Sequence, residues 1–316
     1  MSIKFIVNHG VPAVFGPGSS QTTGERMKAL GASRVLVVCD QGIAGAGLTL
    51  PVEDSIRRAG LTAIRYSDAE LEPTCASFDR AAEAAREAKA DGIVGVGGGS
   101  SMDTAKGVSL LLSNGGRMYD WLCKPNVRTY PLICVPTTSG TSSEVAPNCA
   151  VTDDRTGDKL YSPHSATLAI VDPELQVGCP PFVTACCGFD MLAHTIESYT
   201  NPNMEHWMSD FMDETTIKLA YRWLPKAVRD GSDLEARTWI SFACLNTGYA
   251  FGDKGTHLGH AISDTIHLLD HRVSHGLGCA FALPVVIRHC AVTDPQKIRC
   301  DAEKPGLTLP EHFSCQ

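Results

Sequence analysis

Two side chains that could bind a metal ion lie one helical turn apart in the segment GFDMLAHTIESY, residues 188–199. Asp190 and His194 are four residues apart, and this spacing puts both on one face of a helix with their Cβ atoms about 5 to 6 Å apart. A carboxylate and an imidazole in this arrangement can bind one cation together, because their bonds to the metal are about 2.0 to 2.2 Å long. Taken alone, such a pair is more often an aspartate at a helix start and a hydrogen-bonded core histidine.

A second group of candidate ligands lies downstream, where five of the eleven histidines crowd into residues 257–275. The apolar segment CAFALPVV, residues 279–286, follows at once and favours an interior position over a solvated basic patch. We therefore expect some of these histidines to be metal ligands. Spacing does not say which, because several pairs are one helical turn apart. The five are His257, His260, His267, His271 and His275.

A glycine-rich turn could bind a phosphate group. In GIVGVGGGSSMDTAK a buried strand runs into three glycines, and a helix is predicted to begin directly after them. Glycines let backbone N–H groups approach a bulky anion, and the start of a helix holds phosphate oxygens. The turn residues are Gly97, Gly98, Gly99 and Ser100, and Ser100 with Asp103 could form a capping box. The alternative is an ordinary strand-to-helix turn.

A loop rich in hydroxyl groups, VPTTSGTSSEVAPN (135–148), follows the next predicted strand of the sheet and carries Thr137, Thr138 and Thr141. Parallel strands deliver such loops to the same sheet edge, so two donor-rich loops there favour a dinucleotide ligand. Asp40, at the end of the strand RVLVVC, could accept hydrogen bonds from a ribose 2′-hydroxyl, which favours NAD over NADP. It could equally cap the turn that follows.

Two kinds of element must position these groups. Up to residue 172, short β-branched runs alternate with amphipathic stretches, a pattern typical of a parallel sheet with covering helices. From residue 173 onward, the segments 182–200, 206–230 and 233–251 show helical periodicity. We therefore predict a Rossmann-like α/β domain over residues 1–172 and an all-helical domain over 173–316. Residues 294–316 lack a helical stripe and are predicted to be irregular.

The bulk composition favours a protein of the cytoplasm with small-molecule ligands. A formal net charge of -8, with 27 lysines and arginines spread thinly, argues against nucleic acids and anionic membranes as partners. The thirteen cysteines are scattered without a CxxC pair, so we expect reduced core residues rather than disulfides or a zinc finger. No run approaches the roughly 18 apolar residues of a membrane span, and a homodimer is the default assembly.

Together, these segments resemble the iron-containing, group III alcohol dehydrogenases, which have a dehydroquinate-synthase-like fold. The resemblance runs in order from about residue 5 to residue 290. Its motifs are GGGSSMDTAK (97–106), PTTSGTSSEV (136–145), Lys159 after the VTD turn, DPEL (172–175), GFDMLAHTIESY (188–199), GHAIS (259–263) and SHGLGCAFALP (274–284). Seven motifs in register make the resemblance specific.

The resemblance implies a metal-dependent oxidoreductase that transfers a hydride between NAD(P) and a small alcohol, hydroxy acid or carbonyl compound. It implies Fe²⁺, with Zn²⁺ as an alternative, held by Asp190, His194, His260 and His275. It also implies that the glycine turn holds the pyrophosphate and the threonine loop lines the nicotinamide side, while Asp40 contacts the adenosine ribose. Lys159 matches a further cofactor-contacting position. The cysteines receive no catalytic role.

The sequence departs from the family pattern in two places that concern function. Many members carry a histidine four residues after the third ligand as a proton relay, but this chain has Asp264 there, so Asp264 and His267 are the candidates. Members also continue with several helices after ALP, so the resemblance predicts a shortened helical domain. The alternatives are an enzyme similar to maleylacetate reductase or a polyol dehydrogenase, and a truncated nucleotide-binding protein without catalytic activity.

Overall fold

The computed structural model describes residues 10–125, 130–202, 205–270 and 272–303. They form two compact units, and we describe each by itself. The α/β unit comprises residues 10–138 and 143–176, and the helical unit comprises residues 139–142 and the described residues from 177 onward. The domains 1–172 and 173–316 stay a prediction.

The α/β unit is built on a six-stranded parallel sheet, which confirms the predicted fold class. The strand order is β1-β8-β5-β4-β2-β3. Every neighbouring pair runs parallel, as in alternating strand–helix sequences. The strands are β1 (Ala13–Phe15), β2 (Arg34–Val38), β3 (Thr62–Tyr66), β4 (Gly92–Gly97), β5 (Leu132–Pro136) and β8 (Leu168–Val171).

Helices cover the sheet of the α/β unit, so its central strands are buried. On one face, Val35, Val94 and Ile133 pack with Met27 and Ile56 of the covering helices. On the other face a side chain at Gly95 would collide with α5, so this glycine lets the helix lie close to the sheet. The helices of this unit are α1 (Thr23–Ala29), α2 (Gln41–Gly45), α3 (Leu50–Arg58), α4 (Cys75–Glu87), α5 (Gly99–Asn114) and α6 (Met118–Trp121), with 3₁₀ turns at Ser19–Thr22 and Pro173–Gln176.

Three of the predicted ligand-binding segments follow neighbouring strands at one edge of this sheet. Val38 of β2 pairs with Gly95 of β4, and Gly97 of β4 pairs with Pro136 of β5. Asp40, the glycine turn and Thr137 therefore all lie beyond the carboxyl ends of adjacent parallel strands. This is the edge at which open α/β sheets bind their ligands.

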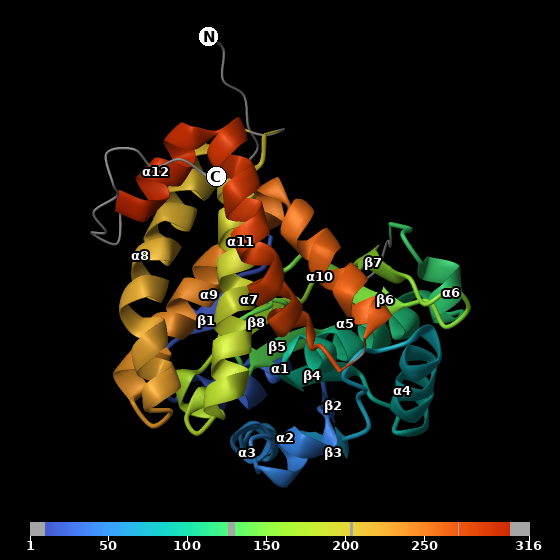
Figure 1. Cartoon of the computed structure of the whole chain (residues 1–316). Helices are drawn as coiled ribbons and strands as arrows, with labels where there is room; N and C mark the ends of the chain where they lie inside the picture. The colour runs from blue at the N-terminus through green and yellow to red at the C-terminus, as the bar shows by residue number, and fades with distance from the viewer. Residues whose placement is uncertain (1–9, 126–129, 203–204, 271, 304–316) are drawn as a thin grey trace. The chain divides into compact units, whose positions relative to one another are not determined.

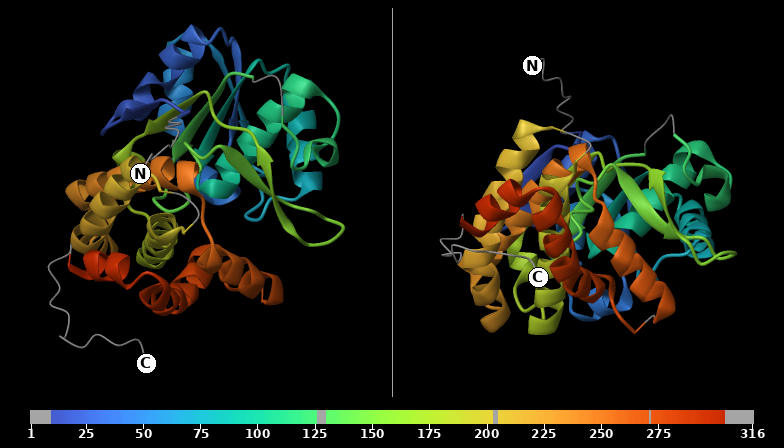
Figure 2. Two further views of the ribbon diagram at one scale, coloured as in Figure 1. Left: turned by 90° about the horizontal axis from the view of Figure 1, so that it is seen from above. Right: turned by 45° about the horizontal axis from the view of Figure 1, so that its top comes forward.

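A small antiparallel hairpin in the α/β unit was not predicted from the sequence. Strands β6 (Asn148–Thr152) and β7 (Lys159–Pro163) pair with each other and form a separate two-stranded sheet (Figure 2). The turn between them is closed by Asp153, which accepts a backbone hydrogen bond from Gly157 at 2.8 Å. Five-residue strands carry too little periodic signal to be separated from a loop.

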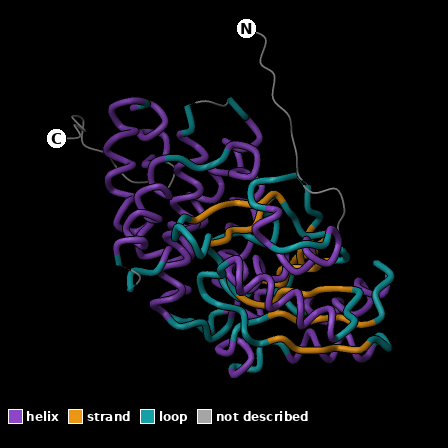
Figure 3. Tube along the Cα trace, turned by 90° about the vertical axis from the view of Figure 1, so that its right-hand side faces the viewer, coloured by secondary structure: helices purple, strands orange, loops and turns teal. Residues whose placement is uncertain are grey.

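The helical unit consists of long helices that pack around apolar faces; the strands, drawn in orange in Figure 3, belong to the other unit. One core joins Met191, Trp223, Leu224 and Ile240 from three helices. The helices are α7 (Pro181–Thr200), α8 (Trp207–Arg229), α9 (Leu234–Lys254), α10 (Leu258–Leu269), α11 (His275–Thr293) and α12 (Pro295–Glu303). The first three confirm the predicted helical segments.

The expectation of an irregular segment from residue 294 onward is wrong for its described part, because α12 begins at Pro295. Proline is favoured in the first turn of a helix, where its missing N–H has no intrahelical partner. Asp294 supports the start by accepting a hydrogen bond from the Lys297 N–H at 3.2 Å. Ile298 is buried against Val286 of α11. Residues 304–316 lie outside the described chain.

Helix α11 is long and apolar enough to cross a membrane by length and composition, a feature that the lengths of uninterrupted apolar runs do not predict. Arg288 and His289 interrupt the apolar run, whereas the mean hydropathy over 18 residues tolerates such interruptions. A core helix passes the same test. In this structure 33% of the apolar window of α11 is buried, and Cys279 and Leu283 on that side pack against Ala193 of α7.

Candidate functional site

Helix α7 presents Asp190 and His194 on one buried face, as their spacing predicts. Both side chains are buried. Pro180 and Pro181 start the helix, and proline suits this position because it fixes the backbone angle of the first turn. The His194 ring is held in place by a contact of 3.0 Å between its Nδ1 and the Asp190 carbonyl oxygen. It also stacks on Phe251, with ring centroids 4.4 Å apart.

Two more histidines reach the same carboxylate from other helices. His260 of α10 brings its Nε2 to 3.6 Å from Asp190 Oδ1, and His275 at the start of α11 brings its Nε2 to 3.5 Å. The Nδ1 atom of His194 lies 3.4 Å from the same oxygen. The structure therefore brings all four predicted ligands together. The three distances are all longer than the 2.7 to 3.2 Å of a good hydrogen bond.

The orientation of His260 is set by Glu197, which lies on α7 two helical turns after Asp190. The His260 Nδ1 lies 2.9 Å from Glu197 Oε1, and Glu197 also accepts a hydrogen bond from the His257 backbone N–H at 2.5 Å. Glu197 is fully buried. With Nδ1–H donated to a carboxylate, the ring turns Nε2 towards Asp190. In the described residues this buried Nε2 has no hydrogen-bond partner.

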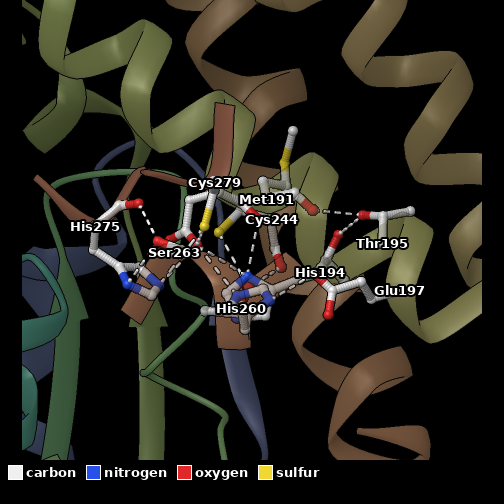
Figure 4. A network of polar contacts seen from close by, with 12 residues as sticks. Met191, His194, Thr195, Glu197, Cys244, His260, Ser263, His275 and Cys279 are labelled. Carbon is white, nitrogen blue, oxygen red and sulfur yellow. Dashed lines mark hydrogen bonds and ion pairs between the residues drawn. The ribbon is translucent and has the colours of Figure 1, made fainter. Parts of the chain in front are cut away.

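A cysteine completes the group. The thiol of Cys279 lies 3.6 Å from Asp190 Oδ1 and 3.8 Å from His275 Nε2. The donor atoms of Asp190, His260, His275 and Cys279 all lie within 4.8 Å of one another. Figure 4 shows the Cys279 sulfur and the rings of His260 and His275 turned towards a common region. Within the described chain, His194 borders this set of four donors.

The protonation of the group reflects the single carboxylate at its centre. Burial alone would raise the pKa of Asp190, but the surrounding imidazoles hold it well below its usual range. Burial opposes charge on His260, yet the neighbouring carboxylates of Asp190 and Glu197 outweigh it and raise the pKa of that ring to about 10. Burial and the charge of His260 lower the pKa of His194 to about 3. The protons on His260 and His275 therefore supply the positive charge that balances the ionised carboxylates of Asp190 and Glu197.

This donor set fits a divalent cation. One carboxylate, neighbouring imidazoles and a thiol are ligands that Zn²⁺ and Fe²⁺ accept, and a cation would displace the protons that His260 and His275 otherwise carry. The buried, unpartnered Nε2 of His260 is the atom that such an ion would satisfy. Buried polar atoms without a partner are rare in native proteins and need an explanation of this kind.

Sequence reasoning missed two members of the group, although helical spacing carries a signal for both. Cys279 follows His275 by four residues and so lies on the same face of α11. Glu197 follows Asp190 by seven residues, which is two helical turns. Neither was selected, because the spacing alone gives many such pairs.

The other histidines of the downstream cluster have different contacts. His257 Nε2 lies 3.0 Å from the Thr200 hydroxyl, and His267 Nδ1 lies 2.8 Å from the Val273 carbonyl oxygen. Asp264, the other relay candidate, brings its Oδ1 to 3.3 Å from His275 Nδ1. His271 lies outside the described residues. Asp264 is thus the relay candidate in contact with the group.

The glycine turn opens helix α5, with Gly98 as its N-cap residue. Gly97 has a φ of 150°, a backbone conformation that side chains rarely adopt, and a Cβ there would collide with Ser101. The expected capping box does not form, because the Ser100 hydroxyl donates to the Leu71 carbonyl oxygen. Asp103 instead accepts hydrogen bonds from the Ser143 hydroxyl and the Ala150 N–H.

Asp40 does cap a turn, which was one of its two expected roles: it accepts a hydrogen bond from the Ile43 N–H at 2.9 Å. The Ser101 hydroxyl also donates to Asp40, across 3.3 Å. A pocket of about 520 Å³ adjoins this carboxylate. It is lined by Asp40, Gln41, Gly42, Ser67, Asp68, Ala69, Glu70 and Leu71.

The remaining predicted cofactor residues lie in both units. Thr137 donates its N–H to the Gly97 carbonyl oxygen at 2.9 Å, and its buried hydroxyl has no hydrogen-bond partner in the described residues. Thr138 lies beside Gly98. Lys159 begins β7 and forms an ion pair with Glu72 at 3.6 Å. Thr141 belongs to the helical unit.

Comparison with known proteins identifies the fold and the enzyme class. The model of the iron-containing alcohol dehydrogenase family matches residues 12–173, and the model of the C-terminal region of that family matches residues 184–306. The chain belongs to the iron-containing alcohol dehydrogenase family. Its predicted fold, its enzyme class and its cofactors, iron and NAD, are thereby confirmed.

Relatives within the iron-containing alcohol dehydrogenases span much of the chain. It is 36% identical to choline dehydrogenase of Bacillus subtilis strain 168, over 96% of this chain and 76% of the relative. It is 32% identical to NAD-dependent methanol dehydrogenase of Bacillus methanolicus, over 93% of this chain and 78% of the relative. The crystal structure of a 1,3-propanediol oxidoreductase superposes with a TM-score of 0.92 at 29% identity, over 98% of this chain and 82% of that chain.

Proposed function

We propose that Asp190, His194, His260 and His275 form the catalytic metal centre of this alcohol dehydrogenase, acting on a small primary alcohol or the matching aldehyde. One observation carries the proposal: imidazoles from three helices converge on a single ionised carboxylate, and the His260 Nε2 among them is buried without a hydrogen-bond partner in the described chain. The substrate class follows from the relatives that are named for choline, methanol and 1,3-propanediol.

When bound, the metal would act as a Lewis acid on the substrate oxygen, and NAD would exchange a hydride with the substrate carbon. The residues of the chain prepare the site for this chemistry. Glu197 holds the Nδ1–H of His260, so that the ring offers Nε2 as a ligand atom. Phe251 covers the His194 ring and excludes water from that side. Asp264, 3.3 Å from His275 Nδ1, is the group we propose for proton transfer, with His267 as the alternative.

The cofactor-binding proposal concerns the edge of the parallel sheet. We assign the pyrophosphate to Gly97, Gly98, Gly99 and Ser100, because backbone N–H groups at a helix start attract anions. Thr137, Thr138 and Thr141 would line the nicotinamide side and Lys159 would make a further contact. Three carboxylates, those of Asp40, Asp68 and Glu70, line the neighbouring pocket, and their charge would repel a 2′-phosphate. This supports NAD over NADP.

Small molecules are the partners that the enzyme class requires. The cytoplasmic location, the homodimer and the absence of nucleic acid and membrane partners remain part of the proposal. The location and the excluded partners rest on the negative net charge, and the homodimer rests on dimers being the commonest assembly.

The test is a panel of short alcohols and aldehydes with NAD, assayed with the chelator-treated protein before and after reloading with Fe²⁺ or Zn²⁺. Asp190→Ala and His275→Ala should reduce activity by at least about 100-fold, because even partners outside the metal's ligands change affinity or activity by about 10 to 100-fold. His289→Gln, at an exposed position of α11, is the matched control and should keep full activity. Metal-independent turnover in Asp190→Ala would refute the proposal.

A further inference from the structure

The threonine loop, residues 135–148, contains an anchor that the cofactor assignment does not use. Residues 139–142 pack within the helical unit, although the chain on both sides of them belongs to the α/β unit. Ser142 is buried, and its hydroxyl donates a hydrogen bond of 2.7 Å to the Cys244 carbonyl oxygen of α9. The same hydroxyl lies 3.3 Å from the Cys244 sulfur. A loop serine usually bonds within its own turn, whereas this partner is 102 residues away.

The backbone of Ser142 has a conformation that serine rarely adopts. Its φ is 50°, in the left-handed region that favours glycine. Such a conformation costs free energy and persists where surrounding contacts hold it in place. The contacts with Cys244 are of this kind, so the hydroxyl fixes this part of the loop against α9.

A second contact holds the same part of the loop against α7. Gly140 lies so close to this helix that a Cβ on it would come within 2.9 Å of the Cys187 Cα and 3.0 Å of the Cys187 carbonyl oxygen. Cys187 precedes Asp190 by three residues, which is about one helical turn. The loop therefore meets α7 one turn before the first of the proposed metal ligands.

Helix α9, to which Ser142 is bonded, also supports the metal site. Phe251 follows Cys244 by seven residues, which is two helical turns, and it stacks on the His194 ring with centroids 4.4 Å apart. Cys244 belongs to the same apolar core as Met191, which directly follows Asp190 (Figure 4). The helices that carry and support the proposed metal ligands thus also hold this part of the loop.

We infer that Ser142 is a positioning residue for hydride transfer. Its hydroxyl fixes the neighbouring Thr141, which we assign to the nicotinamide side, relative to the helices that carry and support the metal ligands. This inference rests on the proposed function and adds a residue outside the assigned ligand and cofactor sets. The expected effect on the reaction is large, because a misplacement of about 1 Å can reduce the rate about 100-fold.

Hydrogen exchange of the full chain, measured by mass spectrometry, tests the anchor without any assay of activity. Ser142→Ala removes the hydroxyl, and Ser142→Gly removes it with a residue that suits the positive φ. In both variants, the amides of residues 139–142 should exchange about tenfold faster, the change expected when one hydrogen bond no longer holds the loop closed. The amides of α7 and α9 should keep their rates.

Ser241→Ala is the matched control for both variants. Ser241 is a buried serine of α9, and its hydroxyl also donates to a carbonyl oxygen, that of Arg237 in the same helix, at 2.7 Å. The control therefore removes a comparable hydrogen bond that does not reach the loop. Its exchange at residues 139–142 should equal that of the wild type.

Kinetics of the metal-loaded protein with NAD and a primary alcohol test the positioning role. Both Ser142 variants should lower kcat by about 10 to 100-fold at saturating substrates, with unchanged metal content. Deuterium on the carbinol carbon should slow these variants more than the wild type, because hydride transfer rather than product release then limits turnover. A fold that is merely less stable would not raise this isotope effect. Ser241→Ala should match the wild type in both measurements.

The possible failures are distinguishable. If NADH does not slow the exchange of residues 137–142 in the wild type, the proposed cofactor site is wrong and the inference falls with it. If NADH protects these residues but both Ser142 variants match Ser241→Ala in exchange and in kcat, only the inference is overturned. An impaired Ser142→Ala beside a normal Ser142→Gly would also overturn it, because the backbone conformation rather than the hydroxyl would then carry the effect.

Discussion

Asp190 in the helical unit and Glu144 in the α/β unit are both buried carboxyl groups, with exposed fractions of 3% and 2%, yet they respond to burial in opposite directions. Burial raises the pKa of Glu144 to about 7, against the smaller effects of its own backbone N–H and of Lys106. The pKa of Asp190 lies well below its usual range despite burial, because imidazoles surround it. Burial by itself therefore does not mark a functional carboxylate; its neighbours do.

The polar groups around these two carboxyls also differ, in whether each has a hydrogen-bond partner. In the α/β unit, Lys106 is fully buried and reaches Ser143 Oγ at 2.8 Å, the Asn148 carbonyl oxygen at 2.7 Å and Asp103 Oδ1 at 3.2 Å. Each of its donors has a partner, so this network stabilises the fold. In the helical unit, donors converge at 3.4 to 3.6 Å and one nitrogen has no hydrogen-bond partner in the described residues. That incomplete arrangement indicates a ligand site.

The largest expected effect on the free energy of unfolding comes from removing Lys106 from its hydrogen-bonded network in the α/β unit. Lys106→Met would leave Asp103 buried without its ion-pair partner, and the loss of one partner of a buried pair costs about 3 to 5 kcal/mol. Urea denaturation should show this loss. The double variant Lys106→Met, Asp103→Leu should recover part of it. A change below about 1 kcal/mol in Lys106→Met would contradict the structural role given to the network.

Glu144→Gln should remove a pH dependence from the stability of the α/β unit. Because the folded-state pKa is about 7 and the unfolded value is 4.5, this carboxyl contributes its stability below pH 4.5 and loses it as the pH rises to 7. The wild type should therefore lose about 3 kcal/mol relative to Glu144→Gln across that interval, at about 1.4 kcal/mol per pKa unit. Urea titrations of both proteins at pH 4.5 and pH 7.5 measure the difference. Parallel curves would show that Glu144 is solvated.

Adding metal should stabilise the helical unit, since the ion binds the folded donor set. At a free metal concentration 100 times the dissociation constant, the gain is about 2.7 kcal/mol. Calorimetry with and without Zn²⁺ should show a raised midpoint in the wild type. Asp190→Asn keeps the size of the side chain and should abolish the shift, whereas Lys106→Met should retain it if the α/β network plays no part in metal binding.

Glu197→Gln should give the smallest of these effects. It replaces the carboxylate at His260 Nδ1 by a neutral amide, which weakens the orientation of the ring without removing a ligand. We expect Zn²⁺ affinity to fall by about 10 to 100-fold, as for other partners of metal-binding histidines. Glu214→Gln, which changes a carboxylate bonded to the Tyr199 hydroxyl, is the control. Equal affinities in all three proteins would show that Glu197 has only a packing role.

Much of the fold could be predicted from the chain alone because its signals are local. The strands at 34–38, 92–97 and 132–136 are short continuous apolar runs, and helices α7 and α8 gather their apolar residues towards one face. The hairpin β6–β7 and helix α12 escaped prediction. Each depends on a few residues whose periodicity is too short to exceed chance, together with packing that the sequence does not display.

The sequence by itself determined which side chains could serve as ligands, because the spacing of Asp190 and His194 on one helix follows from the geometry of a single turn. The motifs of the resemblance then selected His260 and His275 from five histidines. Only the tertiary structure decided that Glu197 orients His260 and that Cys279 joins the group. Those contacts link α7, α10 and α11, and the distances between helices depend on how side chains pack, which no pattern along one helix contains.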